Sequence, residues 1–440
     1  MASEAKTHDS ADDLIDYVNA SPTPWHAVSE SVRRLRDAGY RELLEGDAWT
    51  VAPGERVFVV RGGSSVAALE IGEAPPETGG FRLVGAHTDS PNLRVKPNAH
   101  VERSGQHQLG VEIYGGVLLY TWLDRDLALA GRVMVRTAGG LEARLVRFDR
   151  AMLRVPSLAI HLDRTVNSEG LVLNPQSHMA PLTALASGGA FDLPGMLAQS
   201  VRRDGETLAT ADVLAFDLCA YDVVPATRGG VRGEYVFAPR LDNLASCHAG
   251  LSALLSAPPA PHITRGVFLF DHEECGSQSA QGAQGPFLRD VLTRLVDAHP
   301  RSSRDGLARA LHRSFFVSAD MAHALHPNYA DRHEPQHQPQ LGGGPVIKSN
   351  ANQRYATDAE GQARFELWCA EADVVPQRFV TRTDLGCGTT IGPITASNLG
   401  MRVVDVGNPM LSMHSCREMS GAADVAKMIA ALRAFYSART

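Results

Sequence analysis

Two adjacent carboxylates, Glu273 and Glu274, directly follow an apolar run at residues 266–270 and an Asp-His pair. A β-rich apolar run of this kind is typical of a buried strand that ends at a functional edge. Neighbouring side chains on an extended segment point in different directions, so the two carboxylates cannot share one role. One could hold a metal ion while the other serves as a general base. The alternative is a pair of solvated charges on a loop.

A second apolar run, at residues 81–86, ends in His87 and Asp89. A histidine can bind a metal through one ring nitrogen while the other nitrogen donates to an acceptor, and Asp89 is a candidate for that acceptor. The alternative is an ordinary turn, because Asp-Ser-Pro is common turn chemistry.

Three further residues of the same chemical types follow along the chain. Asp242 opens a helical stretch, where it could also be a simple N-cap, Asp320 follows a strand, and His414 lies in a loop before the last helix. Open α/β sheets place their sites at the carboxyl ends of strands. Two histidines and three carboxylates are sufficient for two zinc-like ions if one carboxylate bridges them.

The chain resembles the M18 aspartyl aminopeptidases, a family of dinuclear zinc exopeptidases. The matching motifs are GAHTDSP (85–91), YGG (114–116), TWLDRDL (121–127), SLAIHL (157–162), PRLDN (239–243), DHEECGS (271–277), SADMAHALHPNY (318–329), GPVIK (344–348) and SMHS (412–415). They occur in the family's order over almost the whole chain. Cys275 replaces a common aliphatic residue, and the glycine run after Tyr114 is short.

The resemblance implies roles for eleven residues. It implies two divalent metal ions, expected to be Zn²⁺ with Co²⁺ or Mn²⁺ as alternatives. The implied metal ligands are His87 and Asp320 for one ion, Glu274 and His414 for the other, and Asp242 as the bridge. Glu273 is the implied general base, and Asp89 is the second residue that the resemblance assigns to catalysis. The implied substrate-binding residues are His161, His323, Lys348 and Tyr355, with His161 supplied by a neighbouring subunit.

The expected substrates are peptides that begin with Asp or Glu. An acidic side chain that enters a partly desolvated pocket needs a cationic partner. Lys348 aligns with the residue that the family places near this carboxylate, although composition alone would favour a surface lysine. Arg382 is the rival, because its planar guanidinium suits bidentate pairing.

The sequence predicts an α/β fold, with a mixed-sheet catalytic domain of the zinc-exopeptidase kind and an inserted β-rich domain. The catalytic domain is assigned to residues 1–94 and 233–440, where apolar strands alternate with helices. The insertion is assigned to residues 95–232, which contain short alternating runs separated by glycine turns. Because His87 precedes the insertion and the other ligands follow it, the two flanks must fold together. The resemblance implies that the insertion mediates self-association into a tetrahedral dodecamer.

Composition is that of an ordinary globular protein. The 440 residues are 44% hydrophobic and 21% charged, and the formal net charge of −7 gives no general affinity for nucleic acid. The amino-terminal residues are polar and no apolar run is long enough to span a membrane, so we expect a cytoplasmic protein without a membrane segment. The six scattered cysteines fit reduced thiols.

Two other functions remain possible from the sequence. A related dinuclear amidohydrolase, such as a deacylase of N-acyl amino acids, would use the same metal scheme with a different pocket. A non-catalytic scaffold on the same fold would lack the general base or a ligand, whereas all of these positions are filled here.

Overall fold

The computed structural model describes residues 9–299 and 303–438, which form two compact units. The first contains the residues up to Asp89, Ala226–Met413 and those from Glu418 onward. The second contains Ser90–Pro225 and the short segment His414–Arg417. The insertion expected at residues 95–232 stays a prediction; the second unit begins at Ser90, ends at Pro225 and also includes segment 414–417.

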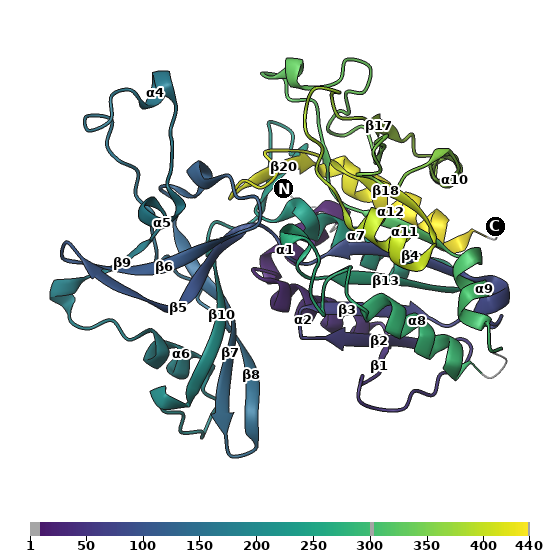
Figure 1. Cartoon of the computed structure of the whole chain (residues 1–440), viewed down its shortest axis with the longest axis horizontal. Helices are drawn as coiled ribbons and strands as arrows, with labels where there is room; N and C mark the ends of the chain where they lie inside the picture. The colour runs from purple at the N-terminus through teal and green to yellow at the C-terminus, as the bar shows by residue number, and fades with distance from the viewer. Residues whose placement is uncertain (1–8, 300–302, 439–440) are drawn as a thin grey trace, which may run out of the picture. The chain divides into compact units, whose positions relative to one another are not determined.

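The first unit is built on a nine-stranded mixed sheet (Figure 1). Its strands are, in spatial order, β1 (Arg41–Glu42), β2 (Arg56–Arg61), β3 (Ser65–Glu70), β13 (Thr264–Phe270), β4 (Phe81–His87), β14 (Phe315–Ala319), β18 (Arg402–Gly407), β16 (Val346–Lys348) and β17 (Gln377–Phe379). The central strands β13, β4, β14 and β18 are mutually parallel. The carboxyl ends of these four strands therefore lie at one edge of the sheet.

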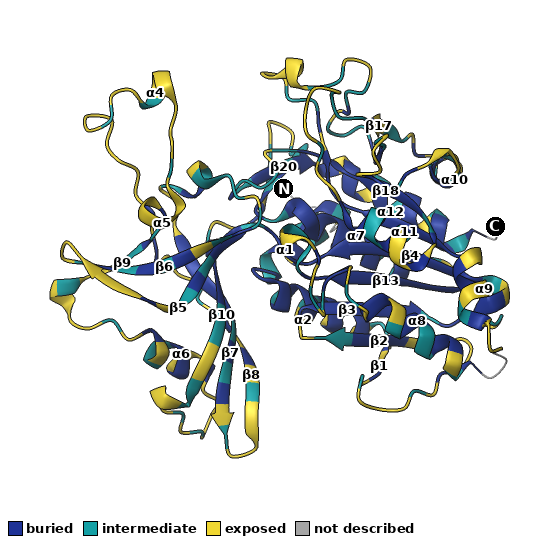
Figure 2. Cartoon of the chain, viewed as in Figure 1, coloured by how far each residue is buried: buried dark blue, intermediate teal, exposed yellow. Residues whose placement is uncertain are grey.

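Helices cover both faces of this sheet, which explains why its central strands are apolar throughout. Along β13, Val267 and Leu269 pack into one core cluster, whereas Phe268 and Phe270 pack into another. The first cluster includes residues of α1 (Ser10–Ala20), α2 (Pro24–Asp37), α7 (Leu241–Ser256), α10 (Ala359–Glu371) and α12 (Ala422–Ser437). The second includes residues of α8 (Phe287–Ala298), α9 (Gly306–Arg313) and α11 (Ile391–Leu399). Figure 2 shows β4 and β13 buried along their length, as expected for parallel strands between two helical layers.

A small five-stranded sheet completes the first unit. Its order is β11 (Thr227–Gly229), β12 (Tyr235–Ala238), β20 (Glu418–Gly421), β19 (Pro409–Leu411) and β15 (Ala322–His323). The antiparallel pairing of β12 with β20 places Ala238 opposite Glu418. This sheet thus brings the chain that leads into Asp242 next to a residue far away in the sequence.

The second unit contains a six-stranded antiparallel sheet. Its order is β8 (Gly140–Arg147), β7 (Leu127–Thr137), β10 (Val213–Asp222), β5 (Asn92–Arg103), β6 (Gln106–Tyr114) and β9 (Leu182–Leu185). Alternate residues such as Val133 and Val135 pack in a core that also holds Leu197 of α6 (Leu193–Val201). The short helices are α3 (Pro76–Gly79) in the first unit and α4 (Val166–Glu169) and α5 (Pro175–His178) in the second.

The predicted α/β class is confirmed, with mixed sheets and twelve α-helices among the described residues. The last helix expected after His414 is α12. None of the helices described at 9–299 and 303–438 has both the length and the apolar character that a membrane crossing requires.

Candidate metal centre

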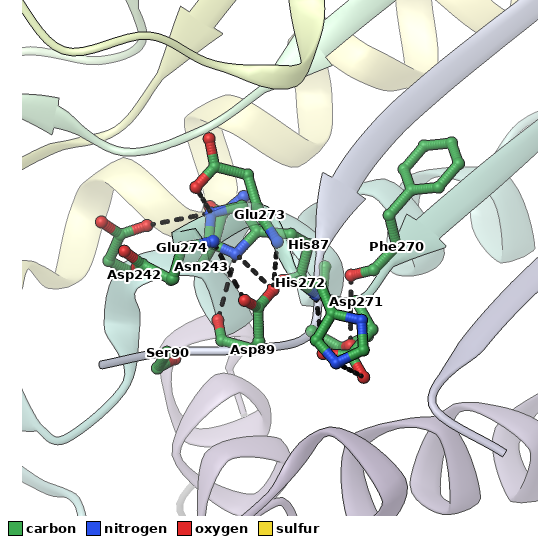
Figure 3. Close-up of polar contacts among 12 residues, drawn as sticks. His87, Asp89, Ser90, Asp242, Asn243, Phe270, Asp271, His272, Glu273 and Glu274 are labelled. Carbon is green, nitrogen blue, oxygen red and sulfur yellow. Dashed lines mark hydrogen bonds and ion pairs between the residues drawn. The ribbon is translucent and has the colours of Figure 1, made fainter. Parts of the chain in front are cut away.

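One imidazole and four carboxylates of the first unit meet at the carboxyl edge of the nine-stranded sheet. His87 is the last residue of β4, and its Nε2 lies 3.5 Å from Oδ1 of Asp242 and 3.9 Å from Oε2 of Glu273. The ligand atoms of His87, Asp242 and Asp320 all lie within 4.8 Å of one another, and so do those of His87, Glu273 and Glu274. Figure 3 shows Asp242 and the two glutamates around the His87 ring.

The His87 ring is oriented by its second nitrogen. Its Nδ1 lies 3.0 Å from the backbone carbonyl oxygen of Asp89 and 3.3 Å from the Oδ1 of that residue. A carbonyl oxygen can only accept, so Nδ1 carries a proton, and Nε2 is the ring nitrogen that faces the carboxylates. The sequence placed the Asp89 side chain as the acceptor, and in the structure the backbone oxygen of the same residue is nearer.

The carboxylate of Asp89 supports the two glutamates directly. Its two oxygens accept hydrogen bonds from the backbone N–H groups of Glu273 at 3.1 Å and Glu274 at 3.0 Å (Figure 3). The expectation that these glutamates continue an extended strand is wrong. Strand β13 ends at Phe270, His272 adopts a left-handed conformation with φ of 64°, and residues Glu273–Cys275 form a 3₁₀ turn. Asp89 stabilises this turn because it satisfies amides at its start, which have no partner within the turn.

Asp242 lies at the start of α7, but the N-cap alternative is wrong. The N-cap position is Arg240, and Asp242 has a non-helical backbone with φ of −81° and ψ of 107°. Its backbone N–H donates to a carboxylate oxygen of the buried Glu418 at 3.1 Å. This contact joins residues 176 positions apart, and no local sequence signal could have revealed it.

Two other supporting contacts were also missed from the sequence. The Cys247 thiol donates to the backbone carbonyl oxygen of His87 at 2.9 Å. The Asn243 side-chain amide donates to the carbonyl oxygen of Ala319, the residue before Asp320, at 2.9 Å. Helix α7 therefore fixes both the strand end that carries His87 and the strand end that carries Asp320.

Burial and mutual repulsion disfavour negative charge in this cluster. Burial raises the pKa of Glu273 to about 8, and the neighbouring carboxylates add to the shift. Burial likewise raises the pKa of Asp320 to about 6, an effect that Lys348 opposes, and raises the pKa of Glu274 well above its usual range. Burial opposes charge on His87 too, but its bonds to Asp242 and Asp89 raise the pKa of its imidazole.

This donor set fits a divalent cation. Imidazole nitrogen and carboxylate oxygen are the ligands that zinc-like ions accept in catalytic sites. A cation among these carboxylates would also offset the repulsion that raises their pKa values. In the part of the chain that the structure describes, neither candidate group of ligands in the first unit contains a cysteine. One group is His87, Asp242 and Asp320, and the other is His87, Glu273 and Glu274.

Two of the predicted substrate-binding residues line a pocket near the same sheet edge. His323 of β15 and Tyr355 contribute to a cavity of about 280 Å³, together with Arg382 and the segments around Phe379 and Cys387. Arg382 is already engaged, because its guanidinium donates to both carboxylate oxygens of Asp384 at 2.9 and 2.7 Å.

Lys348, the last residue of β16, is almost completely buried, with 2% of its surface exposed. Its Nζ donates to the carbonyl oxygen of Met321 at 3.2 Å and lies 3.8 Å from Oδ2 of Asp320. The same atom lies 5.1 Å from the centre of the Tyr355 ring, within the range of a cation–π contact. The surface-lysine alternative is therefore wrong.

The remaining two predicted site residues belong to the second unit. His161 lies exposed in a turn, and His414 has a left-handed backbone with its Nδ1 3.0 Å from the carbonyl oxygen of Gly116. Their assignments, as a substrate-binding residue and a metal ligand, stay predictions.

A helix-covered sheet with a histidine–carboxylate cluster at its carboxyl edge is the architecture expected of a metal-dependent hydrolase. A family model described as aminopeptidase I zinc metalloprotease (M18) matches residues 17–436. The chain belongs to this family, and it is thus an aminopeptidase of a class whose members use divalent metal.

Relatives agree in sequence and in fold. The chain is 51% identical over 426 residues to a probable M18 family aminopeptidase 2 of Pseudomonas aeruginosa, covering 96% of this chain and 97% of that protein. Ape4, solved by cryo-electron microscopy in complex with Nbr1, has a TM-score of 0.93 at 41% identity, with 97% of this chain and 85% of that chain covered. The mApe1 dodecamer of S. cerevisiae has a TM-score of 0.85 at 27% identity, with 98% and 97% covered.

We expect the chelated, metal-free protein to lose stability as the pH rises from about 4.5 to about 8. The unfolded chain releases the Glu273 proton near pH 4.5, whereas the folded chain retains it to about pH 8. The folded state then binds more protons, so the free energy of unfolding falls with rising pH. The raised pKa of His87 acts in the same direction above its usual value. The melting temperature of chelated protein across this range is the measurement.

Glu273→Gln is the matched control for this pH dependence, because the amide keeps the side-chain volume and cannot ionise. The chelated variant should show a shallower decline than the chelated parent chain. An identical decline in both proteins would show that Glu273 has an ordinary pKa.

Proposed function

We propose that the chain removes N-terminal Asp or Glu from peptides with two divalent metal ions, Zn²⁺ in the first instance and Co²⁺ or Mn²⁺ as alternatives. The proposed ligands are His87 and Asp320 for one ion, Glu274 and His414 for the other, and Asp242 between them. The observation that carries the acidic preference is the buried Lys348 ammonium beside Asp320. The M18 membership favours an aminopeptidase over the deacylase and scaffold alternatives.

The residues divide the chemistry between them. When bound, two such ions lower the pKa of a water molecule and polarise the scissile carbonyl group. Glu273 removes a proton from the attacking water and returns it to the leaving amine. Burial raises the pKa of Glu273, and a carboxylate of higher pKa is a stronger proton acceptor than an exposed one. Asp89 keeps Glu273 in place through the bond to its backbone N–H.

Lys348 and Arg382 are the two cations that could bind the acidic side chain of the substrate, and their contacts favour Lys348. Arg382 is neutralised by a bidentate pair with Asp384 and also donates to the carbonyl oxygen of Asp331 at 2.6 Å. Lys348 donates to a single carbonyl oxygen and lies 3.8 Å from Asp320, so its three N–H donors are not all used by these contacts. His323 and Tyr355 are proposed as further substrate contacts.

The chain is also proposed to self-associate, with the second unit forming much of the interface. We propose a tetrahedral dodecamer in which His161 reaches a neighbouring site. The S. cerevisiae relative mApe1 is a dodecamer, which supports the number of subunits. Segment 157–173 of the second unit exposes Leu158 (63%), Leu162 (74%) and Val172 (86%), apolar surface that association would cover. A cytoplasmic location is proposed as well, in keeping with six cysteines that form no disulfide in the described residues.

Glu273→Gln should keep the metal content and lower kcat by about 10²–10⁴-fold, because it removes only proton transfer. The neighbouring isosteric change Glu274→Gln is the control and should instead deplete metal. Metal analysis and turnover on Asp-Ala would be measured on the same samples. Near-normal turnover by metal-loaded Glu273→Gln would refute the general-base assignment.

Lys348→Met should lower kcat/KM for Asp-Ala by about 100-fold or more, because one side of a buried charge pair is lost. Activity on Asn-Ala and Leu-Ala should fall much less, since an uncharged side chain needs no cation. Metal content must be compared, because Lys348 also contacts Asp320. Arg382→Met is the matched control, and a loss of the Asp-over-Asn preference in that variant alone would transfer the role to Arg382.

Self-association is tested by light scattering on the purified chain. We expect a mass about twelve times that of one chain, and Leu162→Glu, a charge placed at an exposed apolar position of the second unit, should reduce it. The control Leu214→Glu changes another exposed leucine of the same unit, outside segment 157–173. A fully active monomer would refute the proposal.

A further inference from the structure

Asp405 is a fully buried carboxylate that takes no part in the chemistry described above. It lies in β18, opposite Ser318 of β14, two residues before Asp320. Burial raises the pKa of its carboxyl group, although the charge of Lys348 and hydrogen bonds from Thr390 and Ala356 oppose that shift. A charge-bearing group in the centre of a sheet is costly unless it is hydrogen-bonded, so its partners indicate what it does.

Those partners belong to two loops that form walls of the His323–Tyr355 pocket. Oδ2 of Asp405 accepts a hydrogen bond from the backbone N–H of Ala356 at 2.6 Å, directly after Tyr355. Oδ1 accepts from the Thr390 hydroxyl at 2.6 Å, two residues after the pocket segment that ends at Gly388. One carboxylate therefore joins both pocket walls to a central strand.

The carboxylate of Asp405 is closely packed against the start of helix α11. A Cβ atom at Gly392 would lie 2.2 Å from Oδ2 of Asp405, so any side chain there would displace the carboxylate or the helix. The backbone N–H of Asp405 donates to Oγ1 of Thr357 at 2.9 Å, which fixes the loop after Tyr355 a second time. The arrangement is thus constrained from both sides of the pocket.

Because Asp405 anchors the loop that carries Tyr355, it also affects the distance between the Tyr355 ring and the Lys348 ammonium. The Tyr355 ring stands 5.1 Å from the Lys348 ammonium, and the residue that follows Tyr355 is the one Asp405 holds. Movement of this loop would shift the ring relative to the ammonium. A displacement of about 1 Å near a reacting centre is enough to change rates by up to about 100-fold.

We propose that Asp405 is a positioning residue for substrate selectivity, which holds Tyr355 against Lys348 through Ala356 and fixes the opposite pocket wall through Thr390. The inference rests on the proposed acidic specificity of the same site. Asp405 contacts neither the proposed metal ligands nor the substrate in this scheme, and it acts through the two loops it anchors. Loss of the anchor should therefore reduce the advantage of an acidic first residue more than it reduces hydrolysis itself.

The experiment compares Thr390→Val with Thr390→Ser, which differ in the hydroxyl that Asp405 accepts from. Thr390 also caps α11, with Oγ1 accepting from the Gly392 N–H at 3.3 Å, and serine retains both bonds. kcat/KM is measured for Asp-Ala, Asn-Ala and Leu-Ala, with metal content and melting temperature as controls. Thr390→Val should lower the Asp-over-Asn ratio by at least about 10-fold with metal content unchanged, and Thr390→Ser should restore it.

A lowered melting temperature with an unchanged Asp-over-Asn ratio would show a merely structural cap and overturn the proposal. Asp405→Ala should abolish the preference in the same way, and if that variant does not fold, the Thr390 pair still decides. A parent enzyme that shows no preference for Asp over Asn would instead refute the proposed acidic specificity.

Discussion

The structure depends on one electrostatic constraint, which is the concentration of negative charge at a buried edge of the nine-stranded sheet. Asp242, Glu273, Glu274 and Asp320 lie around a single imidazole, and burial raises the pKa values of Glu273, Glu274 and Asp320. Such a cluster persists only where the fold holds it and a cation can offset it. The parallel core of β13, β4 and β14 provides the rigid frame, because it delivers three ligand segments to one edge.

The residues around the cluster show how the fold holds these groups. Asp89 holds the backbone of both glutamates, Glu418 holds the backbone of Asp242, and Cys247 holds the carbonyl group of His87. These contacts are made to backbone groups, whereas the His87 ring is oriented by its Nδ1. The carboxylate oxygens and the imidazole Nε2 consequently remain directed toward the centre of the cluster.

Selectivity in the proposed scheme arises from strands β18 and β16, which follow β14 in the same sheet. Lys348 ends β16, which pairs with β18, and Asp405 lies in β18 itself. The ammonium group therefore stands between the metal cluster and the pocket that contains Tyr355 and His323. Lys348 approaches Asp320 to 3.8 Å, so the proposed metal ligand and the proposed substrate-binding cation are neighbours.

The sequence by itself determined the α/β class and the strands that end at His87 and Asp320, because apolar periodicity and turn chemistry are local properties. The motif order was also sufficient to identify the M18 family. Only the tertiary structure decided the 3₁₀ turn at Glu273, which depends on Asp89 from another strand. It likewise decided that Lys348 is buried and that Glu418 and Asp405 accept hydrogen bonds from the backbone of Asp242 and Ala356. These features arise from contacts between residues far apart in the chain, which leave no periodic signal in the sequence.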